Sequence, residues 1–493
     1  MNRLAARQPA LLAGALLALM GVSLLLRTGA LGTGYWIDEG ISVGIASHDL
    51  RDIPSVLGQD GNPPLYYLLL HGWMLVFGTT EAATRALSLL FALLAVPASF
   101  WAGTRLFSRR AGVLAAAGAA GSPFLTYYAQ ETRMYSLVVL LSILASASFV
   151  LAFVRGERKH VVWLGVWLAL LLYTHTWGLF LAAAMGAVWL HLRRRGEVDT
   201  RDGVRLAILL AVAYLPWLPV ILFQAQHTAA PWAERPSPLV LLIIPGGLFG
   251  HVAVPLLALA VYFAVRRRPP VDRAVRMLVG IAIGTAVLAW LSSQIEPAWA
   301  TRYSAVLMGP LLLALASVVA RGRRWTLLAL VGVAAVWAMS GPPASKSNVR
   351  TVSTSIAPSI RPGDLVVSTQ PETVPALHRY LPDGPVYLTP MGPVADPRQT
   401  DWRNGLAKLR AGQAETELLP VIDRLTPGQR VLIVTPIPGE RLSQSPWARA
   451  VRIRTREWRA ALEENARLRP IGGVTTFPQG KNLVRARLYE VRG

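Results

Sequence analysis

Two adjacent acidic side chains, Asp38 and Glu39, follow the first long apolar run of the chain, in the stretch YWIDEGISVG (residues 35–44). A carboxylate held in a pocket can act as a general base toward an attacking hydroxyl group. The plainer interpretation is a pair of solvated charges, because acids are stabilised near helix N-termini. Two carboxylates in one pocket would also raise the pKa of one of them. The local sequence therefore leaves open whether the pair is functional and which acid would be the base.

The segment after this pair is expected to fold onto the membrane surface. Residues 50–59 place Leu50, Ile53, Val56 and Leu57 on one face, as an interfacial helix would. Such a helix would hold the two acids in place instead of leaving them in a mobile loop.

Further candidate residues lie at other junctions between apolar runs. The dense group of tyrosines, acid and arginine in residues 126–136 indicates a pocket wall, although a water-facing helix connection would also fit. The arginine in residues 296–304 is either an interfacial anchor or a clamp for a lipid phosphate. For the histidine of YTHTWG, a satisfied side chain at a helix end is the plainer interpretation. The candidate substrate-binding residues are Asn62, Tyr128, Gln130, Glu131, Arg133, Tyr135, His175, Glu296, Arg302 and Tyr303.

Composition indicates a membrane protein. The 493 residues are 53% hydrophobic and only 15% charged, whereas soluble domains carry about 25% charged residues. The net charge of +22 could indicate a nucleic-acid partner, but most bases of residues 1–340 form short clusters between apolar runs. That pattern is typical of a topology signal, so we expect membrane lipids and no nucleic acid as partners. The absence of cysteine excludes disulfides, thiolate catalysis and thiol metal sites.

Eleven apolar runs are expected to cross the roughly 30 Å of hydrocarbon in a bilayer. Arginine clusters fall at every second junction, which places those junctions in the cytoplasm and the candidate residues outside. Residues 63–78 are interpreted as a short segment in the outer leaflet, because a full span there would invert every later loop. The first run is expected to be an uncleaved signal anchor. The runs lie near residues 9–29, 82–104, 111–127, 136–154, 160–174, 177–192, 204–223, 239–265, 276–293, 303–320 and 325–340.

After residue 340 the pattern changes to short alternating strands and helices, which predicts an α/β domain with an at least partly parallel sheet. It contains 22 basic and 13 acidic residues, and no glycine-rich nucleotide motif. We hypothesise that its net charge of +9 recruits an anionic acceptor polymer or the lipid surface, with salt-sensitive binding. Strands are predicted over residues 364–370, 385–390, 429–436 and 482–491, and helices over residues 373–381, 404–425 and 445–468.

Taken in order over about residues 30–320, several motifs resemble the GT-C glycosyltransferases. The motifs are the DE pair, NPPLYYLLLHGW, FGTTEAATRALSLL, TRLFSRRAG, YYAQETRMYSL and a late RYS. They are most similar to the bacterial branch related to the protein O-mannosyltransferases and the lipid A aminoarabinose transferase. The resemblance implies a polytopic α-helical catalytic domain (1–340) whose first extracytoplasmic loop (30–78) carries juxtamembrane helices. It also implies an extracytoplasmic domain (341–493).

The resemblance further implies an enzyme of the bacterial cytoplasmic membrane. Such an enzyme moves a sugar, here a pentose such as arabinose, or mannose, from a polyprenyl-phosphate carrier to an extracytoplasmic glycan, lipid or protein, with inversion. The expected base corresponds to Asp38, and the other motif positions correspond to Glu131, Arg133 and Arg302. Glu39 beside Asp38 keeps the choice of base open, and Asn62 stands where some relatives carry a charged residue.

The chemistry agrees with a single base. A polyprenyl phosphate departs without protonation, so one carboxylate that deprotonates the acceptor is sufficient, whereas glycoside hydrolysis needs a second carboxylic acid. Arg302 or Arg133 would offset the charge that grows on the phosphate. Some relatives use a divalent metal, and the chain has no dense His and carboxylate cluster, so a metal is left unassigned.

Two other classes of function were weighed. A transporter or flippase of lipid-linked sugars would show internal repeats and polar groups near the membrane midplane, but no repeat is visible and the polar groups gather at one face. A non-catalytic, membrane-anchored glycan-binding assembly protein would tolerate replacement of Asp38.

Overall fold

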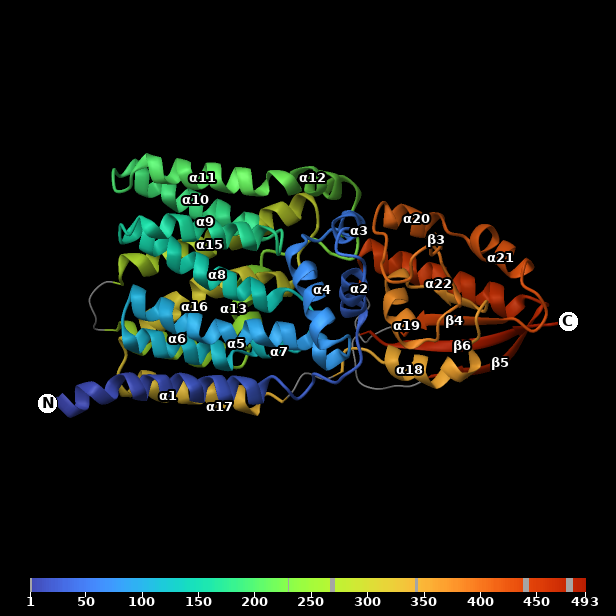
Figure 1. Ribbon diagram of the computed structural model, residues 1–493, viewed down its shortest axis with the longest axis horizontal. Coiled ribbons are helices and arrows are strands. Elements are labelled where there is room, and N and C mark those ends of the chain that lie inside the picture. The colour runs from blue at the N-terminus through green and yellow to red at the C-terminus, as the bar shows by residue number, and fades with distance from the viewer. Residues whose placement is uncertain (1, 229, 267–270, 342–344, 438–442, 476–481) are drawn as a thin grey trace.

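Two regions follow one another along the long axis of the molecule (Figure 1). A bundle of helices contains the N-terminus, and a β-sheet covered by helices contains the C-terminus. In this computed structural model, residues 2–228, 230–266, 271–341, 345–437, 443–475 and 482–493 are described. The helical region here means residues 2–341, and the sheet region means residues 345–493.

Each predicted apolar run coincides with one helix of the helical region or with two or three consecutive helical segments. Helix starts are fixed locally: Thr80, Ser108 and Asp272 each accept a hydrogen bond from a backbone N–H of the first turn that follows, which satisfies donors that a helix start leaves free. The helices are α1 (Asn2–Leu26), α5 (Glu81–Leu106), α6 (Arg109–Gly121), α7 (Pro123–Tyr128), α8 (Tyr135–Phe149) with η1 (Val150–Val154), α9 (Lys159–Leu172), α10 (Gly178–Arg194), α11 (Thr200–Tyr214), η2 (Leu215–Trp217), α12 (Leu218–His227), α13 (Val240–Phe249), α14 (Val254–Val265), α15 (Arg273–Ile295), η3 (Thr301–Ser304), α16 (Ala305–Ala320) and α17 (Arg324–Met339).

Within the described residues, 5 helical segments are long and apolar enough to cross a membrane, and 6 if α13 and α14, which are bent by 91°, form one span. The runs near 160–174 and 325–340 form shorter apolar helices. The fold class is therefore confirmed as a bundle rich in apolar helices, and the count of eleven spans stays a prediction.

Three short helices lie at the end of the bundle that faces the sheet region: α2 (Ile37–Ala46), α3 (Ile53–Asp60) and α4 (Leu65–Phe77). In Figure 1, α4 runs across the long bundle helices, which is the orientation expected of a segment that does not span. The prediction that the apolar face of α3 lies on the membrane surface is wrong. Ile53, Val56 and Leu57 are buried in the protein core, because this face packs against neighbouring segments of the chain instead of against lipid. Leu50 does not share this face and is 54% exposed.

The sheet region contains a six-stranded mixed sheet in the order β3-β2-β1-β4-β6-β5. β1 pairs in parallel with β2 and β4, whereas β6 runs antiparallel to β4 and β5. This confirms the predicted, partly parallel sheet. The strands are β1 (Leu365–Ser368), β2 (Val386–Thr389), β3 (Gly392–Pro393), β4 (Arg430–Pro436), β5 (Leu468–Val474) and β6 (Val484–Val491).

Helices cover both faces of this sheet. One face packs on α18 (Val349–Ile356) and α19 (Val374–Tyr380), and the other packs on α22 (Pro446–Glu464) through Trp458 and Leu462. The four predicted strands are present, whereas β3, β5 and α18 were not predicted. The helix predicted over 404–425 is broken into α20 (Gly405–Ala411), η6 (Ala414–Leu418) and α21 (Leu419–Asp423). Gly412 interrupts it where the chain passes against the carbonyl of Pro390.

The two regions meet at α2, the helix that carries the acidic pair. A Cβ atom on Gly40 would lie 2.8 Å from the backbone nitrogen of Ala376, so glycine lets α2 approach the start of α19 closely. Two residues beyond the end of α2, His48 Nε2 lies 2.7 Å from Asp396 Oδ2. The sheet region therefore packs directly against α2 and fixes its position.

Candidate active site

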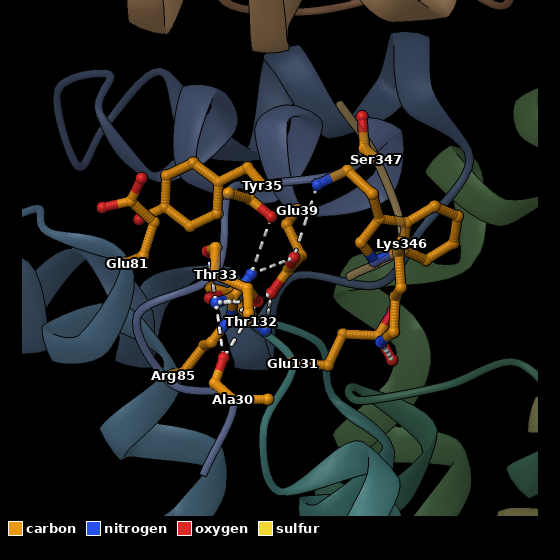
Figure 2. A network of polar contacts seen from close by, with 12 residues as sticks. Ala30, Thr33, Tyr35, Glu39, Glu81, Arg85, Glu131, Thr132, Lys346 and Ser347 are labelled. Carbon is orange, nitrogen blue, oxygen red and sulfur yellow. Dashed lines mark hydrogen bonds and ion pairs between the residues drawn. The ribbon is translucent and has the colours of Figure 1, made fainter. Parts of the chain in front are cut away.

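Glu39 belongs to a buried polar network, which Figure 2 shows. Its two carboxylate oxygens accept hydrogen bonds from Arg85 Nε at 2.7 Å and Nη2 at 2.6 Å, and Oε1 also accepts from the backbone N–H of Thr132 at 2.8 Å. The side chains of Glu39 and Arg85 are 1% and 2% exposed. The remaining N–H groups of Arg85 bind the backbone carbonyls of Ala30, Leu31, Thr33 and Gly34. Glu39 is thus fully engaged in holding the loop that precedes α2.

The neighbouring Asp38 lines a cavity of about 380 Å³, here called the Asp38 cavity. Its Oδ2 lies 3.4 Å from Arg302 Nη2, and no group of the described residues donates a hydrogen bond to that oxygen. The backbone N–H of Trp36 donates its hydrogen bond to Glu39 Oε2, at 3.4 Å, and not to Asp38. Glu39 therefore caps the start of α2, while Asp38 lines the cavity with one oxygen that has no hydrogen-bond donor among the described residues.

The Asp38 cavity brings together candidates that are distant in sequence. Asp60, at the end of α3, and Trp402, from the sheet region, complete its wall. Burial raises the pKa of Asp60 above its ordinary value. The predicted residues that line this cavity are Asn62, Arg133, His175, Glu296, Arg302 and Tyr303.

His175 is a neutral part of this wall. Burial, followed by the charges of Arg133 and Arg302, lowers the pKa of His175 to about 3. Its Nδ1 accepts a hydrogen bond from the backbone N–H of Trp177 at 3.1 Å, and its ring packs edge-on against Tyr303 with centroids 4.7 Å apart. This agrees with the plainer interpretation of a satisfied histidine at a helix end.

A second cavity, of about 360 Å³, also borders Arg302 and is here called the Lys346 cavity. Lys346 Nζ lies 3.1 Å from Glu131 Oε2 and 4.0 Å from the ring centroid of Tyr127. Burial alone would lower the pKa of Lys346, but the nearby Glu131 and Glu39 raise it above its ordinary value. The cavity is lined by Trp36, Tyr127, Tyr128, Glu131, Thr301, Arg302, Lys346 and Asn482.

Two other predicted residues, Gln130 and Tyr135, contact protein groups and line neither cavity. Gln130 accepts a hydrogen bond from the backbone N–H of Ala30 at 2.7 Å and donates one to the carbonyl of Thr126 at 2.9 Å, so it ties two loops together and lines neither cavity. The ring of Tyr135 stands between those of Tyr128 and His175, at centroid distances of 4.8 and 6.0 Å. Tyr135 therefore packs against one lining residue of each cavity, Tyr128 of the Lys346 cavity and His175 of the Asp38 cavity.

Sequence reasoning missed three charged residues of this site. Arg85 lies inside FGTTEAATRALSLL, where its position on an apolar helix was a usable signal for a buried partner. Asp60 stands two residues before the predicted Asn62, and its carboxylate accepts a hydrogen bond from that amide. Lys346 is one of only 4 lysines of the chain and lies in what looked like a plain linker.

No three His, Asp or Glu side chains gather into a metal-binding group in the part of the chain that the structure describes. Asp38, whose side chain lines the Asp38 cavity and is 18% exposed, stands beside the 24% exposed side chain of Arg302, which borders both cavities. This arrangement can accept a proton on one side of the arginine and bind an anion on the other.

Comparisons with known proteins support the fold. Residues 61–222 match the family model described as dolichyl-phosphate-mannose-protein mannosyltransferase. ArnT from Cupriavidus metallidurans, bound to undecaprenyl phosphate, superposes with a TM-score of 0.58 at 14% identity, over 96% of this chain and 98% of that one. AglB, an archaeal oligosaccharyltransferase from Archaeoglobus fulgidus, gives 0.52 at 13% identity over 87% and 70%.

The arabinofuranosyltransferase AftD from Mycobacteria gives a TM-score of 0.53 at 13% identity, over 99% of this chain and 42% of that one. No protein of curated function matches the chain. The predicted resemblance to the GT-C glycosyltransferases is confirmed by the family model and the shared fold, and the predicted enzyme class is that of these neighbours.

Proposed function

We propose that this protein is an inverting membrane glycosyltransferase that moves a sugar from a polyprenyl-phosphate carrier to an acceptor hydroxyl, with Asp38 as the general base. The observation that carries the proposal is the contrast within the acidic pair. Glu39 is bound on both oxygens by Arg85, whereas Asp38 faces a cavity beside Arg302.

The two cavities suggest where each substrate binds. The acceptor hydroxyl would enter the Asp38 cavity, and the donor phosphate would lie toward Arg302 and the Lys346 cavity. As the acceptor oxygen forms its bond to the anomeric carbon, the bond from that carbon to the phosphate oxygen breaks. The hydroxyl proton passes to Asp38, and the phosphate leaves as an anion.

Arg302 is suited to the charge that develops in this step. Its guanidinium is flanked by the rings of Trp36, Trp232 and Tyr303, at 6.0, 5.3 and 5.4 Å from the ring centroids. Rings on several sides hold the guanidinium in place, and a cation fixed in advance stabilises a departing phosphate without having to reorganise during the reaction. Lys346 would provide a second cation, and Arg133 a third on the acceptor side.

The neighbours support the class of carrier proposed here. ArnT was solved with undecaprenyl phosphate and AglB with a dolichol-phosphate, which supports a polyprenyl-phosphate carrier here. The sugar is proposed to be a pentose such as arabinose, or mannose, and the acceptor an extracytoplasmic glycan, lipid or protein. We place the protein in the bacterial cytoplasmic membrane, with residues 1–340 as catalytic domain and residues 341–493 outside.

The test is turnover of radiolabelled polyprenyl-phosphate arabinose or mannose by detergent-purified protein supplied with cell-envelope extract as acceptor. We expect a product of inverted anomeric configuration and a loss of about 10²- to 10⁴-fold in Asp38→Asn, the range for removing a general base. Asp52→Asn is the matched control, because Asp52 is exposed and its side chain does not cap α3. Full turnover by folded Asp38→Asn would refute the mechanism, and no turnover by the wild type would refute the function.

A further inference from the structure

Three arginines surround a cavity of about 320 Å³ in the sheet region, here called the arginine pocket. Arg485 and Arg487 are alternate residues of β6 and share one face of the sheet, and Arg459 reaches the same space from α22. None of the substrate-binding candidates lies in this pocket. Its other lining residues are Ile433, Thr435, Gly472, Gly473, Thr475, Ala486 and Tyr489.

The backbone of the neighbouring strand leaves this space open. Gly472 and Gly473 of β5 carry no side chains into the pocket, and a Cβ atom on Gly472 would meet nothing within 4 Å. The register of β5 against β6 shifts between Pro470 and Gly472, and such a bulge bends the strand. The floor of the pocket is therefore glycine backbone, beside the arginines of β6.

The arginines are held in place but are not neutralised. Thr435 Oγ1 accepts a hydrogen bond from Arg485 Nε at 3.3 Å, which fixes that guanidinium. Glu463 Oε1 serves both Arg487 at 2.5 Å and Arg459 at 3.2 Å, while no carboxylate of the described residues lies within ion-pair distance of Arg485. Burial, and then the charges of Arg459 and Arg487, lower the pKa of Arg485. Three cations with one shared acid leave an excess of positive charge.

We propose that the arginine pocket binds a phosphate group. Guanidinium forks pair with oxyanions through parallel N–H donors, and three forks offer more donors than the two oxygens of a carboxylate accept. A phosphate monoester carries up to two negative charges and three acceptor oxygens, which matches the excess charge. The proposal does not depend on the catalytic role of Asp38. The net charge of +9 in this region predicts anion binding, and the proposal assigns that binding to the arginine pocket.

The test is site-resolved arginine labelling with phenylglyoxal in the full-length protein in detergent, with peptides read by mass spectrometry. At constant ionic strength, inorganic phosphate should reduce labelling of Arg485 and Arg487 at least threefold, whereas chloride should not. Arg469 is the internal control, because it lies on β5, pairs with Glu490 at 2.6 Å and does not line the pocket. Equal protection of Arg469, or equal protection by chloride, would overturn the proposal.

Two further arms identify the source of the phosphate. Protection by a soluble sugar phosphate, but not by vesicles containing phosphatidylglycerol, would assign the pocket to a phosphorylated glycan. The reverse would assign it to a lipid headgroup. In Arg485→Ala, phosphate protection of Arg487 should be lost, while Arg469→Ala should retain it. Undiminished protection of Arg487 in a folded Arg485→Ala protein would refute a shared site.

Discussion

Two regions on either side of the acidic pair differ in how their charges are satisfied. On the Glu39 side, Arg85 holds both carboxylate oxygens and also binds four backbone carbonyls. On the Asp38 side, the contact with Arg302 is 3.4 Å long and Oδ2 has no hydrogen-bond donor among the described residues. Residues adjacent in the sequence therefore occupy a closed network and an open cavity.

The comparison teaches that partner geometry separates two acids that the sequence cannot distinguish. A buried charge that is fully paired has no free lone pair to offer a substrate, and breaking its pair is costly. A buried carboxylate oxygen that has no hydrogen-bond donor costs stability and, beside a cavity, is a candidate for chemistry. We infer that Glu39 positions α2 and the first loop, and that Asp38 reacts.

The largest expected effect tests this division through stability. Glu39→Gln should destabilise the protein by about 3–5 kcal/mol, because it leaves the charge of Arg85 buried and unpaired. Asp38→Asn should change stability by less than about 1 kcal/mol, since it removes one loose contact at a partly exposed side chain. Thermal unfolding in detergent measures both, and Glu39→Gln combined with Arg85→Gln should recover part of the loss. Equal destabilisation by the two single variants would contradict the division.

The next effect concerns Arg302, the cation of the open side. Arg302→Gln should lower kcat by about 10²- to 10³-fold, as expected for loss of a group that stabilises transition-state charge. Arg302→Lys should recover only part of this, because an ammonium lacks the planar fork and its ring contacts. Single-turnover rates at saturating donor are the measurement. An unchanged rate in Arg302→Gln would show that the guanidinium serves structure alone.

Much of this arrangement could be predicted, because it depends on local pattern. Hydrophobic runs gave the bundle helices, and short β-branched segments such as residues 429–436 gave β4. The interfacial interpretation of α3 failed because an apolar face packs equally well on protein as on lipid, and periodicity does not distinguish the two. The role of Arg85 depends on a loop about 50 residues away in sequence, and that of Lys346 on Glu131, so no local signal identified either partner.

A smaller effect on donor binding is expected at Lys346, and it tests whether this lysine contacts the donor phosphate or only neutralises Glu131. Lys346→Met should raise the KM for the donor roughly tenfold, equivalent to about 1.4 kcal/mol, because one cation near the donor phosphate is lost. The double variant with Glu131→Gln separates two explanations. If Lys346 only neutralises Glu131, the double variant should restore donor binding, whereas direct contact with the phosphate predicts that binding stays weak. Restored binding would therefore remove Lys346 from the proposed phosphate site.

The smallest effect extends the comparison to a third carboxylate, Asp60, which faces the cavity as Asp38 does but is bound by Asn62. Burial raises the pKa of Asp60, so the folded protein binds its proton more tightly than the unfolded chain does. This contribution to stability is complete below about pH 4, the ordinary range for Asp, and is lost as the pH rises through the raised pKa.

Asp60→Asn should remove this slope, so the unfolding temperature of the wild type relative to the variant should fall between pH 4 and pH 8. His175 acts in the opposite direction, since its pKa is lowered to about 3 in the folded protein and it stabilises the fold increasingly as the pH rises toward about 6.5. Both proteins contain His175, so the difference between their melting curves isolates Asp60. A difference that does not vary with pH would refute a raised pKa for Asp60, and would leave Asp38 as the sole carboxylate of the open side to be tested by turnover.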